Sequence, residues 1–385
     1  MSLPTTLEMI GDLIATPSVS SVVRSIDMGN EAVTNLIANW CNSAGFSVEI
    51  MPVADNPGHF NLIATLGQGK GGLVLSGHTD TVPFNEALWD SDPFVASERE
   101  GRLYGLGTSD MKSFIALALA AARTFDPRDF KRPLILLATA DEESGMTGAQ
   151  ALLDANRPQA DFAVIGEPTN MRPVRMHKGS FSDGLRLTGR SGHASDPSLG
   201  NNAMEGMYLI IGELLKVRDE WQSTYRNTEF KVPTPTMNLG HIHGGDNPNR
   251  ICGDCEITFD VRALPGMNLE ELQHALHKRL EEAVRHTGLK LDFTMPYNGV
   301  EPMDTPADSP IVSATEKLTG FEASAVNFGT EAPYFAQMGM DVVVLGPGDI
   351  ATAHQPNEHL EIDTVEPTID LLRKLIFQYC VDQSI

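Results

Sequence analysis

Four short apolar runs recur along the chain, at residues 73–76, 134–139, 162–165 and 342–345. Continuous apolar runs of this length are typical of strands that are buried on both faces of a parallel sheet. A stretch rich in alanine and leucine, residues 112–124, separates the first two runs and has the composition of a helix. The pattern predicts an α/β fold in which helices flank a mostly parallel sheet.

The pattern changes at about residue 182. Residues 185–189 and 255–262 have the alternation of strands, and residues 202–217 and 269–287 have the composition of helices. Two strands and two helices suggest a smaller α+β domain inserted into the first one. We therefore expect three parts, namely a first part of the catalytic domain, an inserted α+β domain, and a second part of the catalytic domain: residues 1–181, 182–293 and 294–385.

Composition and charge fit this picture. A chain of 385 residues with 41% hydrophobic and 21% charged residues is long enough for two hydrophobic cores. The formal net charge of -23 makes nucleic acids and anionic membrane surfaces poor partners. Neither property indicates a particular activity.

Two features predict a cytoplasmic location. The N-terminal segment contains Glu8 and Asp12 and lacks the basic residues and apolar run of a secretory signal. The longest apolar stretch, residues 114–122, is far shorter than the roughly 20 residues that cross a bilayer.

The four cysteines do not form the pattern of a disulfide framework, because they are few and scattered: Cys41, Cys252, Cys255 and Cys380. Cys252 and Cys255 form a C-x-x-C pair, but the second pair that a structural zinc site needs is missing nearby. We expect these residues to be buried, reduced thiols.

Potential metal ligands follow the predicted strands. His78 comes after the first strand, Glu142 and Glu143 after the second, Glu167 after the third, and His354 shortly after the last. Ligands of open parallel sheets bind beyond the carboxyl ends of the strands, so we expect these residues to converge. Taken singly, each has another interpretation, as a packed histidine or a solvated loop carboxylate.

Asp110 precedes the alanine-rich helix, where it is either a helix N-cap or a further ligand. Two histidines and three carboxylates suit Zn²⁺, with Co²⁺ or Mn²⁺ as substitutes. One carboxylate can bridge two ions roughly 3.5–4 Å apart. The hypothesis is that Asp110 is this bridge, with His78 and Glu167 on one ion and Glu143 and His354 on the other.

Two more carboxylates have predicted roles beside the metals. Asp80 lies two residues after His78, where it is either a turn residue or an acceptor for the second imidazole N–H. Glu142 adjoins Glu143 and therefore points in a different direction. We expect Glu142 to be the general base that takes a proton from water and returns it to the leaving nitrogen.

Six segments in this order resemble the two-zinc metallopeptidases and deacylases: SGHTDTVP, YGLGTSDMK, ATADEES, IGEPT, SGHAS and AHQPNE. The resemblance runs through nearly the whole chain. It implies two Zn²⁺ per subunit, with Co²⁺ able to substitute, and the metal roles given above for His78, Asp110, Glu143, Glu167 and His354. It also implies that Asp80 orients a ligand and that Glu142 is the base.

The same resemblance implies that the insert is a lid or dimerisation domain and that the protein is a homodimer. It further implies that His193, in SGHAS, reaches the partner's active site and stabilises the oxyanion. On its own, an exposed histidine would be assigned to the surface.

Further segments, such as VRMHKGSFS, NLGHIHGGDNPNRIC and NFGTEAPYF, resemble the family members that hydrolyse N-acetyl-L-ornithine to L-ornithine and acetate in arginine biosynthesis. This likeness suggests that Lys178, Asn249 and Arg262 hold the carboxylate of this small-molecule substrate. Glu331 is the candidate for binding the distal amine, or is simply a charge at a helix start.

Two alternatives stay open. The substrate could instead be that of a desuccinylase or a dipeptidase, because the metal centre does not select the side chain beyond the amide. A binding protein without hydrolytic activity is a further alternative, although every expected ligand and Glu142 is present. A serine route is not indicated, because the chain has no G-x-S-x-G motif.

Overall fold

The computed structural model describes residues 3–54, 56–295 and 299–382. The first two residues of the N-terminal segment considered above, and short pieces of the expected catalytic domain, lie outside these ranges. The chain divides into two compact units. The first comprises Met1–Arg175, Thr305–Ser324 and Thr330–Ile385, and the second comprises Met176–Asp304 and Ala325–Gly329. The second unit thus extends beyond the expected insert, residues 182–293, on both sides.

The first unit is built on a sheet whose four middle strands are parallel. These are, in spatial order, β6 (Leu134–Thr139), β3 (Leu73–His78), β7 (Phe162–Pro168) and β15 (Asp341–Gly346). Antiparallel strands β2 (Phe60–Leu66) and β1 (Ser47–Pro52) follow beside β6. On the other side, Val174 of β8 (Val174–His177) pairs with β15. The predicted α/β class with a mostly parallel sheet is confirmed.

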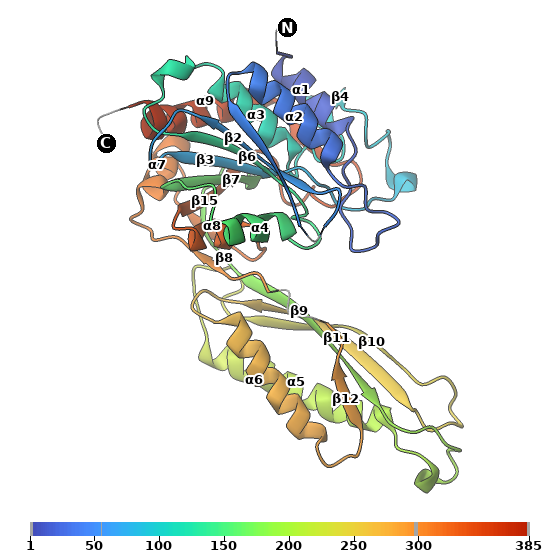
Figure 1. Cartoon of the computed structure of the whole chain (residues 1–385). Helices are drawn as coiled ribbons and strands as arrows, with labels where there is room; N and C mark the ends of the chain where they lie inside the picture. The colour runs from blue at the N-terminus through green and yellow to red at the C-terminus, as the bar shows by residue number, and fades with distance from the viewer. Residues whose placement is uncertain (1–2, 55, 296–298, 383–385) are drawn as a thin grey trace. The chain divides into compact units, whose positions relative to one another are not determined.

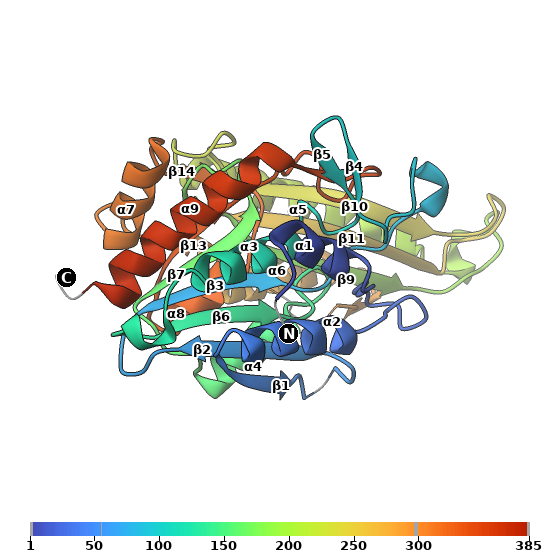
Figure 2. The ribbon, with the colours of Figure 1, turned by 90° about the horizontal axis from the view of Figure 1, so that it is seen from above.

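Helices cover both faces of this sheet (Figures 1 and 2). One face carries α1 (Thr6–Ile14), α2 (Glu31–Ser43), α3 (Lys112–Ala122) and α9 (Val365–Ile376), and α7 (Pro310–Thr319) packs beside α9. The other face carries α4 (Thr147–Ala155) and α8 (Ala332–Gln337). Every residue of α3 is buried, as expected for a helix that is apolar all round and lies inside a domain.

A small antiparallel sheet completes the first unit. Its strands are β16 (His359–Glu361), β5 (Arg102–Tyr104) and β4 (Ser97–Arg99). It joins the segment before Asp110 to the segment after His354. Two predicted ligand loops therefore run next to each other.

The second unit contains an antiparallel sheet with the order β10 (Thr236–Gly244), β11 (Asp254–Ala263), β9 (Gly179–Thr188) and β12 (Lys290–Phe293). Helices α5 (Ala203–Thr224) and α6 (Leu269–Val284) pack on it. The sequence predicted both helices and the strands β9 and β11, but it missed β10 and β12. These two are the edges of the sheet, and most of β10 is exposed on both faces, so it lacks the apolar alternation of a half-buried strand.

Two short strands pair with β8, whose residues belong to both units. In the second unit, the end of β8 pairs with β13 (Met303–Asp304). Strand β14 (Ser324–Val326) also pairs with β8.

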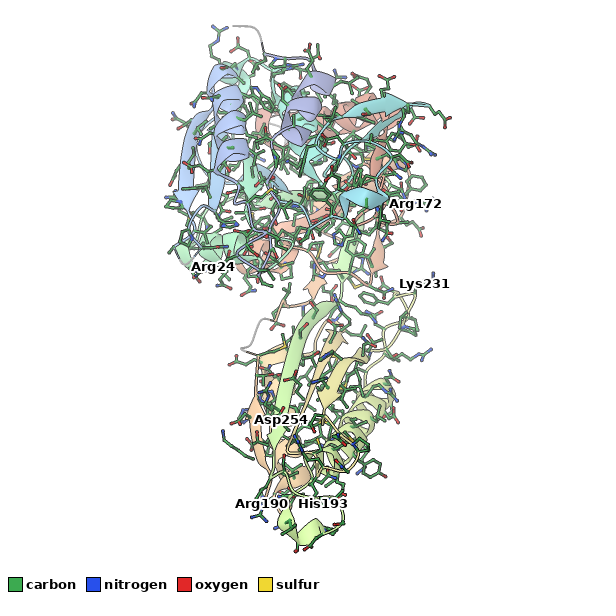
Figure 3. The ribbon with its side chains drawn as sticks, turned by 90° about the vertical axis from the view of Figure 1, so that its right-hand side faces the viewer. Arg24, Arg172, Arg190, His193, Lys231 and Asp254 are labelled. Carbon is green, nitrogen blue, oxygen red and sulfur yellow. The ribbon has the colours of Figure 1, made fainter. Side chains whose placement is uncertain are left out.

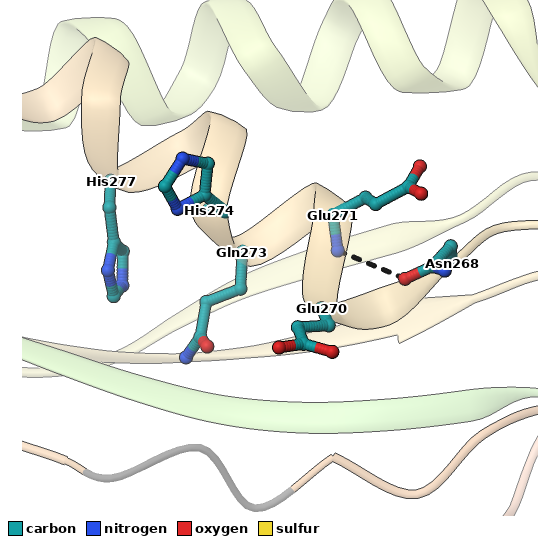
Figure 4. Close-up of a pocket in the computed structure, with 6 residues that line it drawn as sticks. All are labelled: Asn268, Glu270, Glu271, Gln273, His274 and His277. Carbon is teal, nitrogen blue, oxygen red and sulfur yellow. Dashed lines mark hydrogen bonds between the residues drawn. The ribbon is translucent and has the colours of Figure 1, made fainter.

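A pocket lies at the start of α6 (Figure 4). Asn268 caps the helix by accepting a hydrogen bond from Glu271 N, at 3.0 Å. Gln273 and His277 point toward the sheet, where both meet the fully buried carboxylate of Asp183, at 3.0 and 2.5 Å. These polar groups are therefore used to hold α6 on β9.

All four cysteines are free and buried, as predicted. Over the described residues, no helix is long and apolar enough to cross a membrane.

A buried histidine should make the stability of the second unit depend on pH. His177 is fully buried, and its Nδ1 lies 2.9 Å from Lys178 O. Burial lowers the pKa of His177 from 6.5 to about 4, so below pH 6.5 the unfolded chain binds a proton that the folded chain does not. We expect this residue to remove about 2 kcal/mol of unfolding free energy between pH 7 and pH 5.

Urea unfolding of wild type and His177→Gln at both pH values measures this contribution. The variant should lose less stability on acidification than wild type. His274→Gln, at an exposed position of α6, is the control and should behave like wild type. An equal loss in wild type and His177→Gln would contradict the prediction.

Candidate metal centre

The five predicted ligands lie together in the first unit. His78 ends β3, Glu143 follows β6, Glu167 lies near the end of β7 and His354 follows β15. Asp110 comes from the segment before α3; the N-cap of that helix is Met111, so Asp110 is not a helix cap. The carboxyl ends of the parallel strands bring these distant parts of the chain to one edge of the sheet.

The five side chains form two groups that share Asp110. Its Oδ1 lies 3.0 Å from His78 Nε2, and that nitrogen lies 3.7 Å from Glu167 Oε1. Its Oδ2 lies 3.3 Å from His354 Nε2, which lies 3.0 Å from Glu143 Oε2. Within each group the potential ligand atoms all lie within 4.8 Å of one another. Each group has the donors and the spacing that a divalent ion requires.

The electrostatics of the cluster favour a bound cation. Burial and the charge of Asp110 raise the pKa values of Glu143 and of Glu167, the latter well above its usual range. The hydrogen bonds to Asp110 and Glu143 raise the pKa of His354 to about 10. For His78, burial lowers the pKa, but the hydrogen bond to Asp110 and nearby carboxylates outweigh it. The pKa values of both histidines are raised because several carboxylates lie close to them. A bound metal ion would neutralise this negative charge.

Asp80 holds the main chain of the glutamate pair. Its two carboxylate oxygens accept hydrogen bonds from Glu142 N and Glu143 N, at 3.2 and 3.0 Å. The sequence predicted that this carboxylate would accept the second imidazole N–H of His78. Instead, His78 Nδ1 is closest to the main-chain oxygen of Asp80, at 3.0 Å, and lies 3.7 Å from the carboxylate.

A sharp turn at the end of β6 presents Glu142 and Glu143. Asp141, just before them, has a φ of 63°, in the left-handed region that is unfavourable for residues other than glycine. Its carboxylate accepts hydrogen bonds from the hydroxyls of Ser20 and Thr147, at 2.8 and 2.6 Å. These bonds help to hold the strained turn.

Glu142 reaches the cluster without belonging to either group of three above. Its carboxylate lies within 4.8 Å of ligand atoms of His78 and Glu143. Burial, and next the charge of Glu167, raise the pKa of Glu142 well above its usual range. A group in this place can accept a proton from a water molecule beside the two ion positions.

Glu331 is 1% exposed, and its charge contributes to the raised pKa values of Glu142 and Glu167. Its Oε2 accepts a hydrogen bond from Thr139 Oγ1 at 2.8 Å, and its Oε1 is buried without a hydrogen-bond partner among the described residues. Burial raises the pKa of Glu331 to about 7. In this state the carboxylate is not open to solvent.

Sequence reasoning missed two buried charges near the cluster, Lys112 and Glu358, each 1% exposed. Lys112 Nζ donates to Thr16 O and Ser18 Oγ, at 2.8 and 3.1 Å. Glu358 accepts hydrogen bonds from three main-chain N–H groups of the segment that carries Asp110. Both lie in quoted motifs, TSDMK and AHQPNE, but only the fold reveals what they contact.

Two predicted substrate-binding residues lie near one end of β9 in the second unit. Lys178 precedes β9, and Arg262 is paired with Ser180. Lys178 Nζ donates to Thr234 O at 2.7 Å, and Arg262 Nε donates to Asp260 Oδ1 at 2.9 Å. Burial, and next the charge of Arg262, lower the pKa of Lys178.

His193 and Asn249 lie beyond the other end of β9. Their segments are joined by the hydrogen bond from Ala194 N to Asn249 O, and Figure 3 shows His193 beside Arg190 at the lower end of the unit. Ten strand residues span about 33 Å. Within the second unit, Asn249 is therefore far from Lys178 and Arg262, and the three do not surround one carboxylate there.

Comparisons with known proteins agree with this arrangement. The sequence model of "Peptidase family M20/M25/M40" matches residues 74–378. Over 384 residues the chain is 47% identical to an acetylornithine deacetylase of Proteus mirabilis, covering 100% of this chain and 99% of that one.

Solved structures show the same fold at low sequence identity. An M20 family metallo-carboxypeptidase from Sulfolobus solfataricus superposes with a TM-score of 0.78 at 18% identity, covering 98% of this chain and 99% of the other. A dinuclear metal-binding peptidase of the M20 family from Bacillus subtilis gives 0.67 at 13% identity, covering 96% of each chain. The family match and the full-length relative together lead to one conclusion: the chain belongs to peptidase family M20/M25/M40.

Proposed function

We propose that the protein hydrolyses the amide bond of N-acetyl-L-ornithine at a centre of two zinc ions. The observation that carries the proposal is that Asp110 is shared by two groups of potential ligands. In this assignment His78 and Glu167 would hold one ion, Glu143 and His354 would hold the other, and Asp110 would be shared by both. Co²⁺ would be able to substitute for Zn²⁺, because nitrogen and oxygen donors suit both ions.

Bound there, divalent ions would polarise the acyl carbonyl. They would also lower the pKa of a water molecule, so that it can lose a proton and attack the carbonyl carbon. Glu142 is placed to take the proton of the attacking water and deliver it to the nitrogen of the leaving amino acid. Asp80 supports this by fixing the main chain of Glu142 through its N–H group. The products are acetate and L-ornithine.

His193 is assigned to the oxyanion that forms during attack. Its Nδ1 accepts a hydrogen bond from Ser195 N at 3.2 Å, so a neutral ring carries its proton on Nε2. The side chain is exposed and can donate this N–H to an oxygen of another molecule. Because Asn249 lies beside His193, the two residues would reach a substrate together.

We further propose that the protein is a cytoplasmic homodimer and that the second unit mediates the pairing. Its edge strand β10 is unpaired on one side among the described residues. Large apolar side chains are exposed on β10 and α5, among them Ile242 at 54% and Tyr208 at 76%. Exposed apolar groups of this kind favour a protein partner.

The assignment of the substrate rests on the Proteus mirabilis relative and on the residues available for ornithine. Lys178 and Arg262 offer cationic groups for its carboxylate. Glu331 is the candidate for the distal amine, provided that substrate gains access to its buried Oε1. An ammonium group bound there would supply the missing partner.

Competition between substrates tests this proposal. The value of kcat/KM for N-acetyl-L-ornithine should exceed that for N-acetyl-L-norvaline, which lacks only the distal amine, by about 10–100-fold. It should also exceed that for N-succinyl-diaminopimelate by at least about tenfold. Faster hydrolysis of the succinyl compound, or of a dipeptide, would contradict the substrate while leaving amide hydrolysis in place. If none of these compounds were hydrolysed, the alternative of a binding protein without hydrolytic activity would be favoured.

A further inference from the structure

Glu358 lies four residues after His354 and is 1% exposed. Its Oε1 accepts hydrogen bonds from Gly107 N, Ser109 N and Asp110 N, at 3.1, 2.7 and 2.9 Å. Three main-chain N–H groups from one short segment thus converge on a single carboxylate oxygen.

We propose that Glu358 is a positioning residue of the metal centre, which fixes the carboxylate of Asp110 between His78 and His354. It does so through the main chain of the segment that carries Asp110, without touching substrate. The inference rests on the proposed two-ion site.

The carboxylate of Glu358 is costly to bury. A buried carboxylate is tolerated when its hydrogen bonds are satisfied, and here they are satisfied almost entirely by the segment before Asp110. The hydrogen bonds of Glu358 therefore favour one backbone conformation of that segment.

The segment is built to wrap around Glu358. Gly107 has a φ of 89°, and a Cβ atom added there would lie 2.7 Å from Lys112 Cδ. This close approach and conformation require glycine. Gly105 N also donates to the main-chain oxygen of Glu358, at 3.1 Å. Main-chain and side-chain groups of Glu358 hold both ends of residues 105–110.

Glu358 also links two ligand segments, because it shares a short loop with His354. Both His354 and Asn357 in this loop have left-handed backbones, with φ of 59° and 61°. Asn357 Oδ1 accepts a hydrogen bond from Asp90 N at 2.9 Å. This hydrogen bond helps to fix the loop. Glu358, which belongs to the same loop, therefore sets the distance of Asp110 from His354.

The test compares Glu358→Gln and Glu358→Ala with wild type. Glutamine keeps the size but replaces one acceptor oxygen with an NH₂ group that faces the N–H of Gly107. Glu361→Gln is the matched control, since Glu361 is also close to His354 in sequence but pairs with Arg102 at a half-exposed position, at 2.7 Å. Each chelator-stripped protein is titrated with Zn²⁺ and with Co²⁺, and the absorption spectrum of the Co²⁺ form is recorded.

Wild type and Glu361→Gln should bind two ions with the same affinities and the same Co²⁺ spectrum. Glu358→Gln should bind at least one ion about 10–100-fold more weakly, with an altered Co²⁺ spectrum. At saturating metal its kcat should fall while KM stays unchanged. Thermal unfolding of the metal-free proteins identifies a folding defect; if the alanine variant does not fold, the glutamine variant decides.

Wild-type ion affinities and spectrum in Glu358→Gln would overturn the inference. Fewer than two ions bound by wild type would instead overturn the proposed two-ion site.

Discussion

Replacing Glu142 by glutamine should lower kcat by about 10²–10⁴-fold, the range over which a positioned general acid and base contributes. Glutamine has nearly the same size but cannot accept the proton of water. The carboxylate of Glu142 lies beside ligand atoms of His78 and Glu143, yet the proposed ligand set does not need it. Zinc content and KM should therefore stay close to wild type.

Steady-state kinetics and metal analysis of the same preparations measure this effect. Glu86→Gln, an exposed glutamate of the first unit, is the control and should keep full activity. A Glu142→Gln protein that binds zinc and hydrolyses substrate at the wild-type rate would show that another group is the base. A protein that has lost zinc would place Glu142 among the ligands.

Removal of the metal ions should lower the hydrolysis rate by at least about 10³-fold, because several kcal/mol of transition-state stabilisation would be lost. Addition of Zn²⁺ or Co²⁺ should restore it. In Asp110→Asn the shared carboxylate becomes neutral, so the two groups of ligands lose their common anionic member. This variant should remain inactive after metal is added.

Dialysis against a chelator, followed by titration with each ion, provides the measurement. Asp154→Asn, which changes an exposed side chain on α4, is the control and should recover with wild type. If chelator-treated protein free of metal retained its rate, the metal-dependent route would be wrong. Full recovery of Asp110→Asn would remove the bridging role but not the requirement for metal.

The sequence predicted that the candidate ligands would converge because the signal for their position is geometric. His78, Glu143, Glu167 and His354 follow apolar runs that are recognisable as buried strands, and parallel strands bring their carboxyl ends to one edge. The main parallel sheet and the packed helix α3 were predictable for the same reason, since buried elements have strong apolar patterns.

Other features of the structure have a weaker signal in the sequence. Edge strand β10 has few buried positions, so its pattern did not indicate a strand. Glu358 is an ordinary loop glutamate until the fold shows three N–H groups around it. The motif resemblance grouped Asn249 with Lys178 and Arg262, because a motif identifies residues but gives no distances between them. In the structure, the length of β9 separates Asn249 from the other two residues within the second unit.

The interrupted order of the first unit has a consequence for synthesis on the ribosome. The chain leaves this unit after Arg175 and returns at Thr305, and β15, which lies between β7 and β8, is translated near the end. The parallel sheet therefore stays incomplete while more than a hundred intervening residues emerge. A nascent chain acquires His354 only after that, so the group of Asp110, Glu143 and His354 is completed late, whereas His78, Asp110 and Glu167 are all translated before the chain leaves this unit.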